Sequence, residues 1–179
     1  MVIEEHVVEY GLTKIFLLTI DLWQYSYFNL LFLFSAGYGA PKLRQLADKV
    51  AAAGYYVVVP DFFYGDPLTP GANIEDWLKN HEQAVDFAKQ VIQALKEKGV
   101  TKIGAAGFCC GAKVVVELAK DGEIQFAALL HSSFVTLDDI KGVKVPIGIL
   151  GAEIDKRSPP ELVKEFKAAL LCHILFFNR

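Results

Sequence analysis

The sequence has few cysteines and no excess of positive charge. Three cysteines in 179 residues, two of them adjacent, provide neither a disulfide framework nor the spaced ligands of a zinc site. Because stable disulfides mark oxidising compartments, this usage favours a reduced, cytoplasmic location. Lys and Arg total 18 against 21 Asp and Glu, the net charge is −3 and no basic cluster occurs, so a nucleic-acid partner is not expected.

The N-terminus lacks the basic segment, apolar core and small-residue cleavage site of a signal peptide. Residues 15–34 are long enough to span a bilayer, but polar residues interrupt them, among them Asp21, and a carboxylate at the bilayer centre is costly. We therefore do not expect a membrane partner and keep a membrane helix over 15–34 as the alternative. The favoured interpretation is one or two strands over 2–19 and a short buried strand over 30–34.

Apolar residues are abundant, at 53% of the chain against 22% charged, and this length and composition suit a single domain over residues 1–179. Short β-branched or aromatic runs alternate with segments in which apolar residues recur at helical spacing. The predicted strands are 30–34, 55–59, 102–106, 126–130 and 145–150, and the predicted helices are 42–53, 73–98, 112–120 and 159–171. This alternation predicts an α/β fold with a mostly parallel sheet flanked by helices.

The segment Gly107-Phe108-Cys109-Cys110-Gly111 lies between a predicted strand and a predicted helix. This is the setting of the G-x-S-x-G nucleophile elbow, in which a sharp turn presents the central side chain beyond the sheet. Cys109 stands at the centre, where a helix N-terminus lowers the pKa of a thiol, and the N–H of Cys110 would point at a developing oxyanion. Three alternatives remain: a small-residue turn that allows close packing, a vicinal Cys109–Cys110 disulfide, and a small redox protein that uses both cysteines.

Two further polar residues follow strands whose carboxyl ends should meet Cys109 at one edge of the sheet. Asp155 comes after strand 145–150, in the order nucleophile then acid found in hydrolases of this architecture. The alternative is a loop aspartate that caps helix 159–171. His131 ends the strand before it, and is either a structural turn residue or a substitute base for Cys109.

Three segments taken together resemble the plant-type branch of the dienelactone hydrolase family. They are Gly107-Phe108-Cys109-Cys110-Gly111-Ala112-Lys113, Val59-Pro60-Asp61-Phe62-Phe63-Tyr64-Gly65-Asp66-Pro67, and Gly151-Ala152-Glu153-Ile154-Asp155 followed by Ser158-Pro159-Pro160-Glu161. The likeness runs from about residue 37 to about residue 170, so the family-like core is 37–170 and the divergent ends are 1–36 and 171–179.

This resemblance implies a three-layer α/β-hydrolase fold, no metal and no organic cofactor. It also implies hydrolysis of a small-molecule ester or lactone through an acyl-cysteine intermediate. Matched residue by residue, it makes Cys109 the nucleophile and Asp155 the acid that orients a histidine. The N–H of Cys110 and the loop at Ser35 become the oxyanion donors.

The sequence departs from the family pattern at three places. The family histidine lies in a loop after one more strand beyond helix 159–171, and too few residues follow Asp155 for that strand and loop, so we expect a sheet that is incomplete at its C-terminal edge. His173 lies in an apolar tail instead. No carboxylate stands near Phe34, where the family places one, and no arginine stands near Gly65, which argues against an acidic dienelactone substrate.

Two functions follow from these observations. The first is an ester or lactone hydrolase with a cysteine nucleophile, impaired by the loss of the catalytic histidine. The second is a non-catalytic remnant that binds a small ligand or a protein partner. We expect the abrupt ends to reflect a truncated or alternatively spliced product, or a gene-model error, and the apolar ends predict a homodimer.

Overall fold

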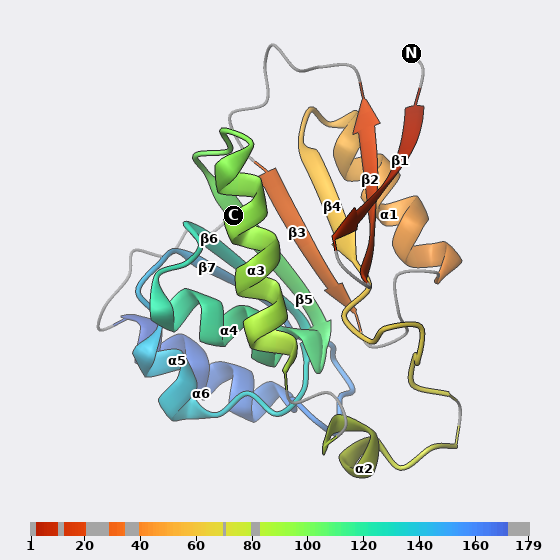
Figure 1. Ribbon diagram of the computed structural model, residues 1–179. Helices are drawn as coiled ribbons and strands as arrows, with labels where there is room; N and C mark the ends of the chain where they lie inside the picture. The colour runs from red at the N-terminus through yellow and green to blue at the C-terminus, as the bar shows by residue number, and fades with distance from the viewer. Residues whose placement is uncertain are drawn as a thin grey trace.

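The computed structural model describes residues 3–10, 13–20, 29–34, 40–69, 71–79 and 83–171, and in these ranges it places a seven-stranded sheet (Figure 1). The strands are β1 (Ile3–Tyr10), β2 (Thr13–Ile20), β3 (Asn29–Phe34), β4 (Tyr56–Pro60), β5 (Ile103–Cys109), β6 (Phe126–Ser132) and β7 (Ile147–Leu150). Their order in the sheet is β1-β2-β4-β3-β5-β6-β7. The pairs β1/β2 and β2/β4 are antiparallel and all the others are parallel, so the mostly parallel sheet is confirmed.

Helices cover both faces of this sheet. They are α1 (Pro41–Ala52), α2 (Ile74–Lys79), α3 (Ala84–Glu97), α4 (Gly111–Asp121), α5 (Leu137–Gly142) and α6 (Pro160–Leu171). Figure 1 shows α3 and α4 in front of the sheet and α1 behind it. The three-layer α/β architecture expected from the sequence is therefore confirmed.

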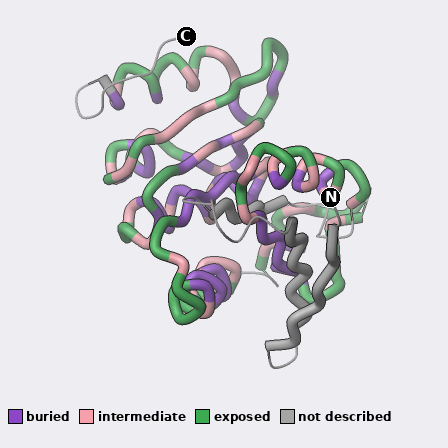
Figure 2. Tube along the Cα trace, turned by 90° about the horizontal axis from the view of Figure 1, so that it is seen from above, coloured by how far each residue is buried: buried purple, intermediate pink, exposed green. Residues whose placement is uncertain are grey.

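Consecutive apolar residues of the central strands pack alternately on the two faces of the sheet. In β4, Val57 and Val59 pack with α1, whereas Val58 belongs to the cluster under α3 and α4. Ala105 and Ala106 of β5 divide in the same way, because successive side chains of a strand point to opposite faces. The buried residues consequently lie along the strands and on the inward sides of the helices (Figure 2). An uninterrupted apolar run is what a parallel strand covered on both sides requires.

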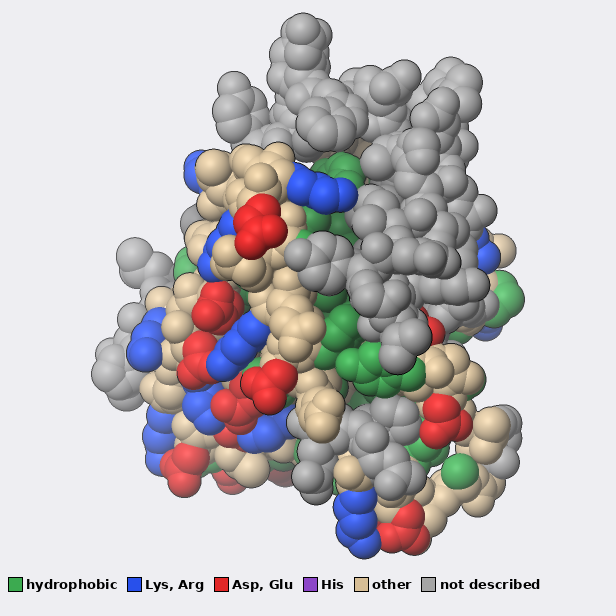
Figure 3. All heavy atoms as spheres, in the orientation of Figure 1, with side chains coloured by type: hydrophobic (Ala, Val, Ile, Leu, Met, Phe, Trp, Pro, Cys, Tyr) green, Lys and Arg blue, Asp and Glu red, His purple; other side chains and the backbone are tan. Residues whose placement is uncertain are grey.

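The outer face of the front helices is charged and of mixed sign (Figure 3). Ion pairs join α3 to the end of α4, with Lys89 Nζ 2.6 Å from Asp121 Oδ2 and Lys96 Nζ 3.0 Å from Glu123 Oε2. Both pairs are partly exposed, so each contributes little to stability. Their role is to keep this face hydrated and without a dominant charge.

The prediction of one helix over 73–98 is wrong, because the structure divides it into α2 and α3. Trp77 fastens α2 to the preceding loop: its Nε1–H donates to the carbonyl of Asp66 at 3.0 Å, and its ring lies 4.5 Å from that of Phe63. Asn73 caps the start of α2, since its Oδ1 accepts from the N–H groups of Glu75 and Asp76.

Helix α5 was not predicted from the sequence. A capping box starts it, in which Thr136 Oγ1 accepts from the Asp139 N–H and Asp139 Oδ2 accepts from the Thr136 N–H. Asp139 also pairs with Lys113 Nζ at 2.7 Å and Lys120 Nζ at 3.2 Å, both on α4. These contacts fix α5 against α4.

The alternative of a membrane helix over 15–34 is wrong for its described part, which forms β2 and β3. No helix within the described ranges combines the length and apolar character needed to cross a membrane. Ser35, His173 and the apolar tail 172–179, to which the homodimer prediction refers, lie outside the described residues. β7 is an edge strand of the sheet as described and pairs with β6.

Candidate active site

Cys109 occupies a strained corner between β5 and α4. Its φ is 53°, in the left-handed region that residues other than glycine rarely adopt. The pairing of β5 with β6 shifts register between Phe108 and Cys109, which places Cys109 opposite Ser132. The side chain is partly exposed, as the predicted strand-turn-helix requires.

Gly107 makes this corner possible because α4 begins directly against its backbone. A Cβ at this position would lie 2.4 Å from the carbonyl oxygen of Gly111 and 2.6 Å from the nitrogen of Ala112. Any side chain would therefore push the first turn of α4 away from β5. The glycine is needed for close approach of strand and helix.

The segment that follows β6 packs against Cys109. Ser133 Oγ lies 3.4 Å from Cys109 Sγ, and the Ser133 N–H donates to the Cys109 carbonyl at 3.0 Å. Sequence reasoning missed Ser133, although its place just after a strand parallel to β5 was a usable signal, because carboxyl ends of parallel strands share one edge. We call this side, formed by the ends of β5, β6 and β7 and the loops after them, the carboxyl edge.

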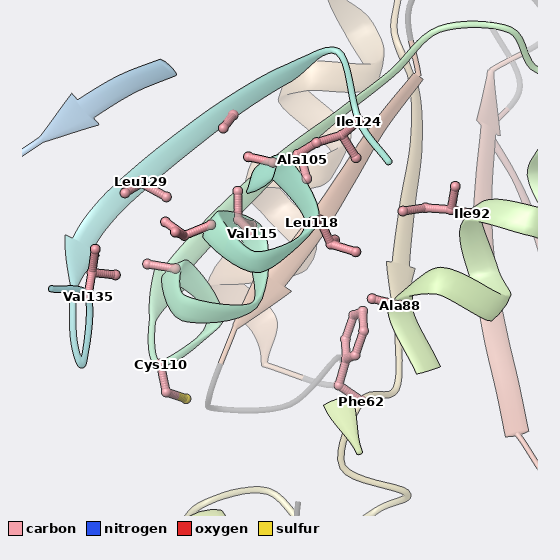
Figure 4. Close-up of a cluster of buried hydrophobic side chains, with 14 of the residues drawn as sticks. Phe62, Ala88, Ile92, Ala105, Cys110, Val115, Leu118, Ile124, Leu129 and Val135 are labelled. Atoms are coloured by element: carbon pink, nitrogen blue, oxygen red, sulfur yellow. The ribbon is translucent and has the colours of Figure 1, made fainter. Parts of the chain in front are cut away.

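Cys110 differs from Cys109 in its surroundings. It precedes α4 and, at 6% exposed, belongs to the apolar cluster that includes Val115 and Phe62 (Figure 4). Both cysteines carry thiols, so the alternative of a vicinal disulfide is wrong. A buried thiol beside a partly exposed one also disfavours the redox alternative, because exchange requires access to both sulfurs.

Asp155 lies at the same carboxyl edge with its side chain fully buried. Oδ1 accepts from the N–H groups of Arg157 at 2.8 Å and Ser158 at 3.0 Å. Both donors precede α6, so the alternative that Asp155 caps this helix is wrong. Burial acts to raise the pKa of Asp155, but the hydrogen bonds from Ser158, Arg157 and the His131 ring outweigh it and lower the pKa.

The second oxygen of this carboxylate binds a histidine. Asp155 Oδ2 lies 2.6 Å from His131 Nδ1, and the His131 side chain is 57% exposed. The φ of His131 is 49°, which turns the chain at the end of β6. The structure thus joins His131 to Asp155 and places both at the edge of the sheet where β5 ends in Cys109. The second predicted oxyanion residue, Ser35, lies outside the described residues.

Two further contacts join the loops that carry His131 and Asp155. Ser132 Oγ donates to Ser158 Oγ at 3.1 Å, and the Arg157 guanidinium lies 5.0 Å from the centre of the Phe134 ring. In the described part of the chain, no three His, Cys, Asp or Glu side chains gather in a way that could hold a metal ion. The functional groups that the described residues place at this edge include a thiol, hydroxyls and a histidine–carboxylate pair.

The family model of the dienelactone hydrolase family matches residues 32–173. The chain belongs to this family. Among curated proteins, an endo-1,3;1,4-beta-D-glucanase of Zea mays is 46% identical over 132 residues, which cover 73% of this chain and 43% of that protein. A carboxymethylenebutenolidase homolog of Homo sapiens is 32% identical over 127 residues, covering 66% of this chain and 52% of the relative. The chain spans about half the length of these relatives.

Solved structures show the same fold. The crystal structure of a putative dienelactone hydrolase from Klebsiella pneumoniae matches with a TM-score of 0.74 at 15% identity, covering 89% of this chain and 75% of that one. At this identity the likeness concerns architecture alone. The fold of this dienelactone hydrolase family member is the α/β-hydrolase fold.

Proposed function

We propose that this chain hydrolyses ester or lactone bonds of small molecules through attack by Cys109. The observation that carries the proposal is the placement of a partly exposed cysteine at a positive-φ corner, on the edge that also holds the Asp155–His131 pair. Family membership supports hydrolysis as the reaction class. The elbow supports covalent catalysis, because a sharp strand-to-helix turn presents the side chain of the nucleophile at the edge of the sheet.

The proposed intermediate is a thioester on Cys109. The thiolate adds to the substrate carbonyl, and the negative charge that develops there lies near the start of α4, whose N-terminal N–H groups favour an anion. The Cys110 N–H is the proposed donor on this side, and the loop at Ser35 is the proposed second donor. Asp155, ionised because its pKa is lowered, holds a histidine for proton transfer.

On this proposal turnover is slow. The sequence given holds no counterpart of the histidine that the family resemblance implies, and a positioned acid–base group contributes about 10²–10⁴-fold to a rate. A non-catalytic ligand-binding protein is the competing proposal, and it predicts no turnover above the uncatalysed rate.

A second candidate substrate is a mixed-linkage glucan, because the Zea mays relative is named for one. Most glycosidases use two carboxyl groups about 5–9.5 Å apart, one of which must be able to donate a proton. The Asp155 carboxylate has a lowered pKa and both its oxygens accept hydrogen bonds. It is therefore suited to holding a histidine and poorly suited to the role of a general acid.

The test compares the full chain with Cys109→Ala and with Cys172→Ala, which removes a thiol from a part of the sequence not assigned to the site. Hydrolysis of p-nitrophenyl acetate and release of reducing ends from mixed-linkage β-glucan are measured for each. We expect ester hydrolysis that is lost in Cys109→Ala and kept in Cys172→Ala, with no glucan cleavage. Iodoacetamide should also label Cys109 faster than Cys172. Equal ester hydrolysis by the chain and Cys109→Ala contradicts the proposal.

A further inference from the structure

We infer that His131 is the base that accepts the proton of the Cys109 thiol, with Asp155 holding its ring. The inference rests on the proposed function, in which Cys109 is the nucleophile. It assigns catalysis to a histidine that precedes the acid in the chain. Catalytic triads are defined by geometry and role, and unrelated folds arrange the same groups in different chain orders.

The Asp155–His131 contact fixes which ring nitrogen is basic. Asp155 is ionised at neutral pH because its pKa is lowered, and an ionised carboxylate only accepts hydrogen bonds. The proton in the 2.6 Å contact therefore belongs to His131 Nδ1. In the neutral ring this leaves the lone pair on Nε2, which is the arrangement of a general base oriented by a carboxylate.

His131 is the neighbour in sequence of the β6 residue that pairs with Cys109. Cys109 pairs with Ser132 across neighbouring strands, which lie about 4.8 Å apart. Ser133, on the other side of Ser132, already contacts Cys109 Sγ through its hydroxyl at 3.4 Å. His131 Nε2 then takes the proton directly or through one water molecule, as general bases do.

The same loops are held together without His131, which argues against a purely structural role. Oδ1 of Asp155 is bound by the N–H groups of Arg157 and Ser158, and Ser132 Oγ donates to Ser158 Oγ. The His131 ring is more than half exposed, so it adds little buried area, but it is accessible to a substrate.

The proton moves in a closed cycle. His131 Nε2 takes the thiol proton as Cys109 Sγ bonds to the carbonyl carbon, and the resulting imidazolium gives that proton to the alkoxide as the C–O bond breaks. Water then attacks the thioester, His131 takes a proton from it, and the C–S bond breaks to release the acid. The thiolate recovers the proton from His131. The net reaction is ester plus water to acid plus alcohol, with no change of oxidation state.

The test uses His131→Asn and His131→Ala in the full chain. Asparagine tolerates the left-handed φ of this position and can donate to Asp155, but it is not a base. Glu153→Gln, which removes an exposed carboxylate from the loop of Asp155, is the matched control. Each variant is assayed for p-nitrophenyl acetate hydrolysis and for the rate of Cys109 alkylation by iodoacetamide, and thermal unfolding checks that it folds.

We expect His131→Asn to slow both reactions by about tenfold or more, and added imidazole to restore part of the rate of His131→Ala. Glu153→Gln should behave as the unmodified chain. A rate of alkylation in His131→Asn within about twofold of that chain, or no rescue by imidazole, overturns the inference. These outcomes differ from a failure of the proposed function, in which hydrolysis would persist in Cys109→Ala. The alkylation rate tests the role of His131 even where turnover is undetectable.

Discussion

A single methyl group at Gly107 should move the start of α4 and disable the elbow. In Gly107→Ala the new Cβ would lie 2.4 Å from the Gly111 oxygen, whereas ordinary contact begins near 3.4 Å, so the backbone must separate by roughly 1 Å. The contacts are with main-chain atoms, which cannot rotate away. Overpacking of this kind costs about 1–3 kcal/mol, and we expect about 3 kcal/mol here.

The same displacement should reduce activity. It would move the Cys110 N–H by about the same distance from its proposed position at the oxyanion, and a misplacement of about 1 Å can cost about 10²-fold in rate. The predicted signature of Gly107→Ala is therefore a joint loss: about 3 kcal/mol in the free energy of unfolding by urea and about 10²-fold in p-nitrophenyl acetate hydrolysis.

Gly148→Ala is the matched control, since it places the same methyl group on β7, an edge strand of the same sheet. Its Cβ would lie 3.9 Å from Phe126 Cζ, an ordinary contact. We expect its free energy of unfolding to change by no more than about 0.5 kcal/mol. If Gly107→Ala unfolds at the same urea concentration as Gly148→Ala, the close approach of β5 and α4 is contradicted.

Two further predictions concern Ser133 and Asp139. Ser133→Ala removes the hydroxyl beside Cys109 Sγ, a hydrogen bond worth about 1 kcal/mol, so iodoacetamide should label Cys109 about fivefold more slowly; an unchanged rate would show that the contact does not hold the sulfur. Burial acts to raise the pKa of Asp139, but Lys113, Thr136 and Lys120 outweigh it and hold the pKa well below its ordinary value. A carboxyl group whose pKa is lower in the folded state than in the unfolded state stabilises the fold when the pH is above the unfolded-state pKa. This stabilisation is lost as the pH falls through the folded-state pKa. Asp139→Asn should therefore lower the free energy of unfolding by about 1–2 kcal/mol at pH 7, and its difference from the unmodified chain should begin to close below about pH 4 and vanish at still lower pH. The exposed neighbour variant Asp138→Asn should show no such difference, and parallel curves for Asp139→Asn and the unmodified chain would contradict this.

Local sequence patterns were enough to predict the framework of the site. The glycines around Cys109 and the apolar run before it predict a strand-turn-helix. This could be read from the sequence because a strand, a turn and the start of a helix are determined by residues that are adjacent in the chain. The split between α2 and α3 was not predicted, since it depends on Trp77 reaching the carbonyl of Asp66 in another segment. Helix α5 is only six residues long, too short for apolar periodicity, although the spacing of Thr136 and Asp139 matches a capping box.

The sequence could place His131 at the correct edge but could not choose between its two roles. That choice depends on a contact between loops that follow different strands, and only the fold shows that the ring meets Asp155. The resemblance to the family directed attention to a histidine further along the chain. In the structure the Asp155 carboxylate is instead hydrogen-bonded to His131, which precedes it in the chain.

Acylation of Cys109 can be measured as the mass of the intact protein after brief exposure to p-nitrophenyl acetate, followed by peptide mapping. We expect one added acetyl group, located on Cys109 and absent from Cys109→Ala. Turnover of the ester with no acetyl group on Cys109, or the same labelling in Cys109→Ala, would contradict it.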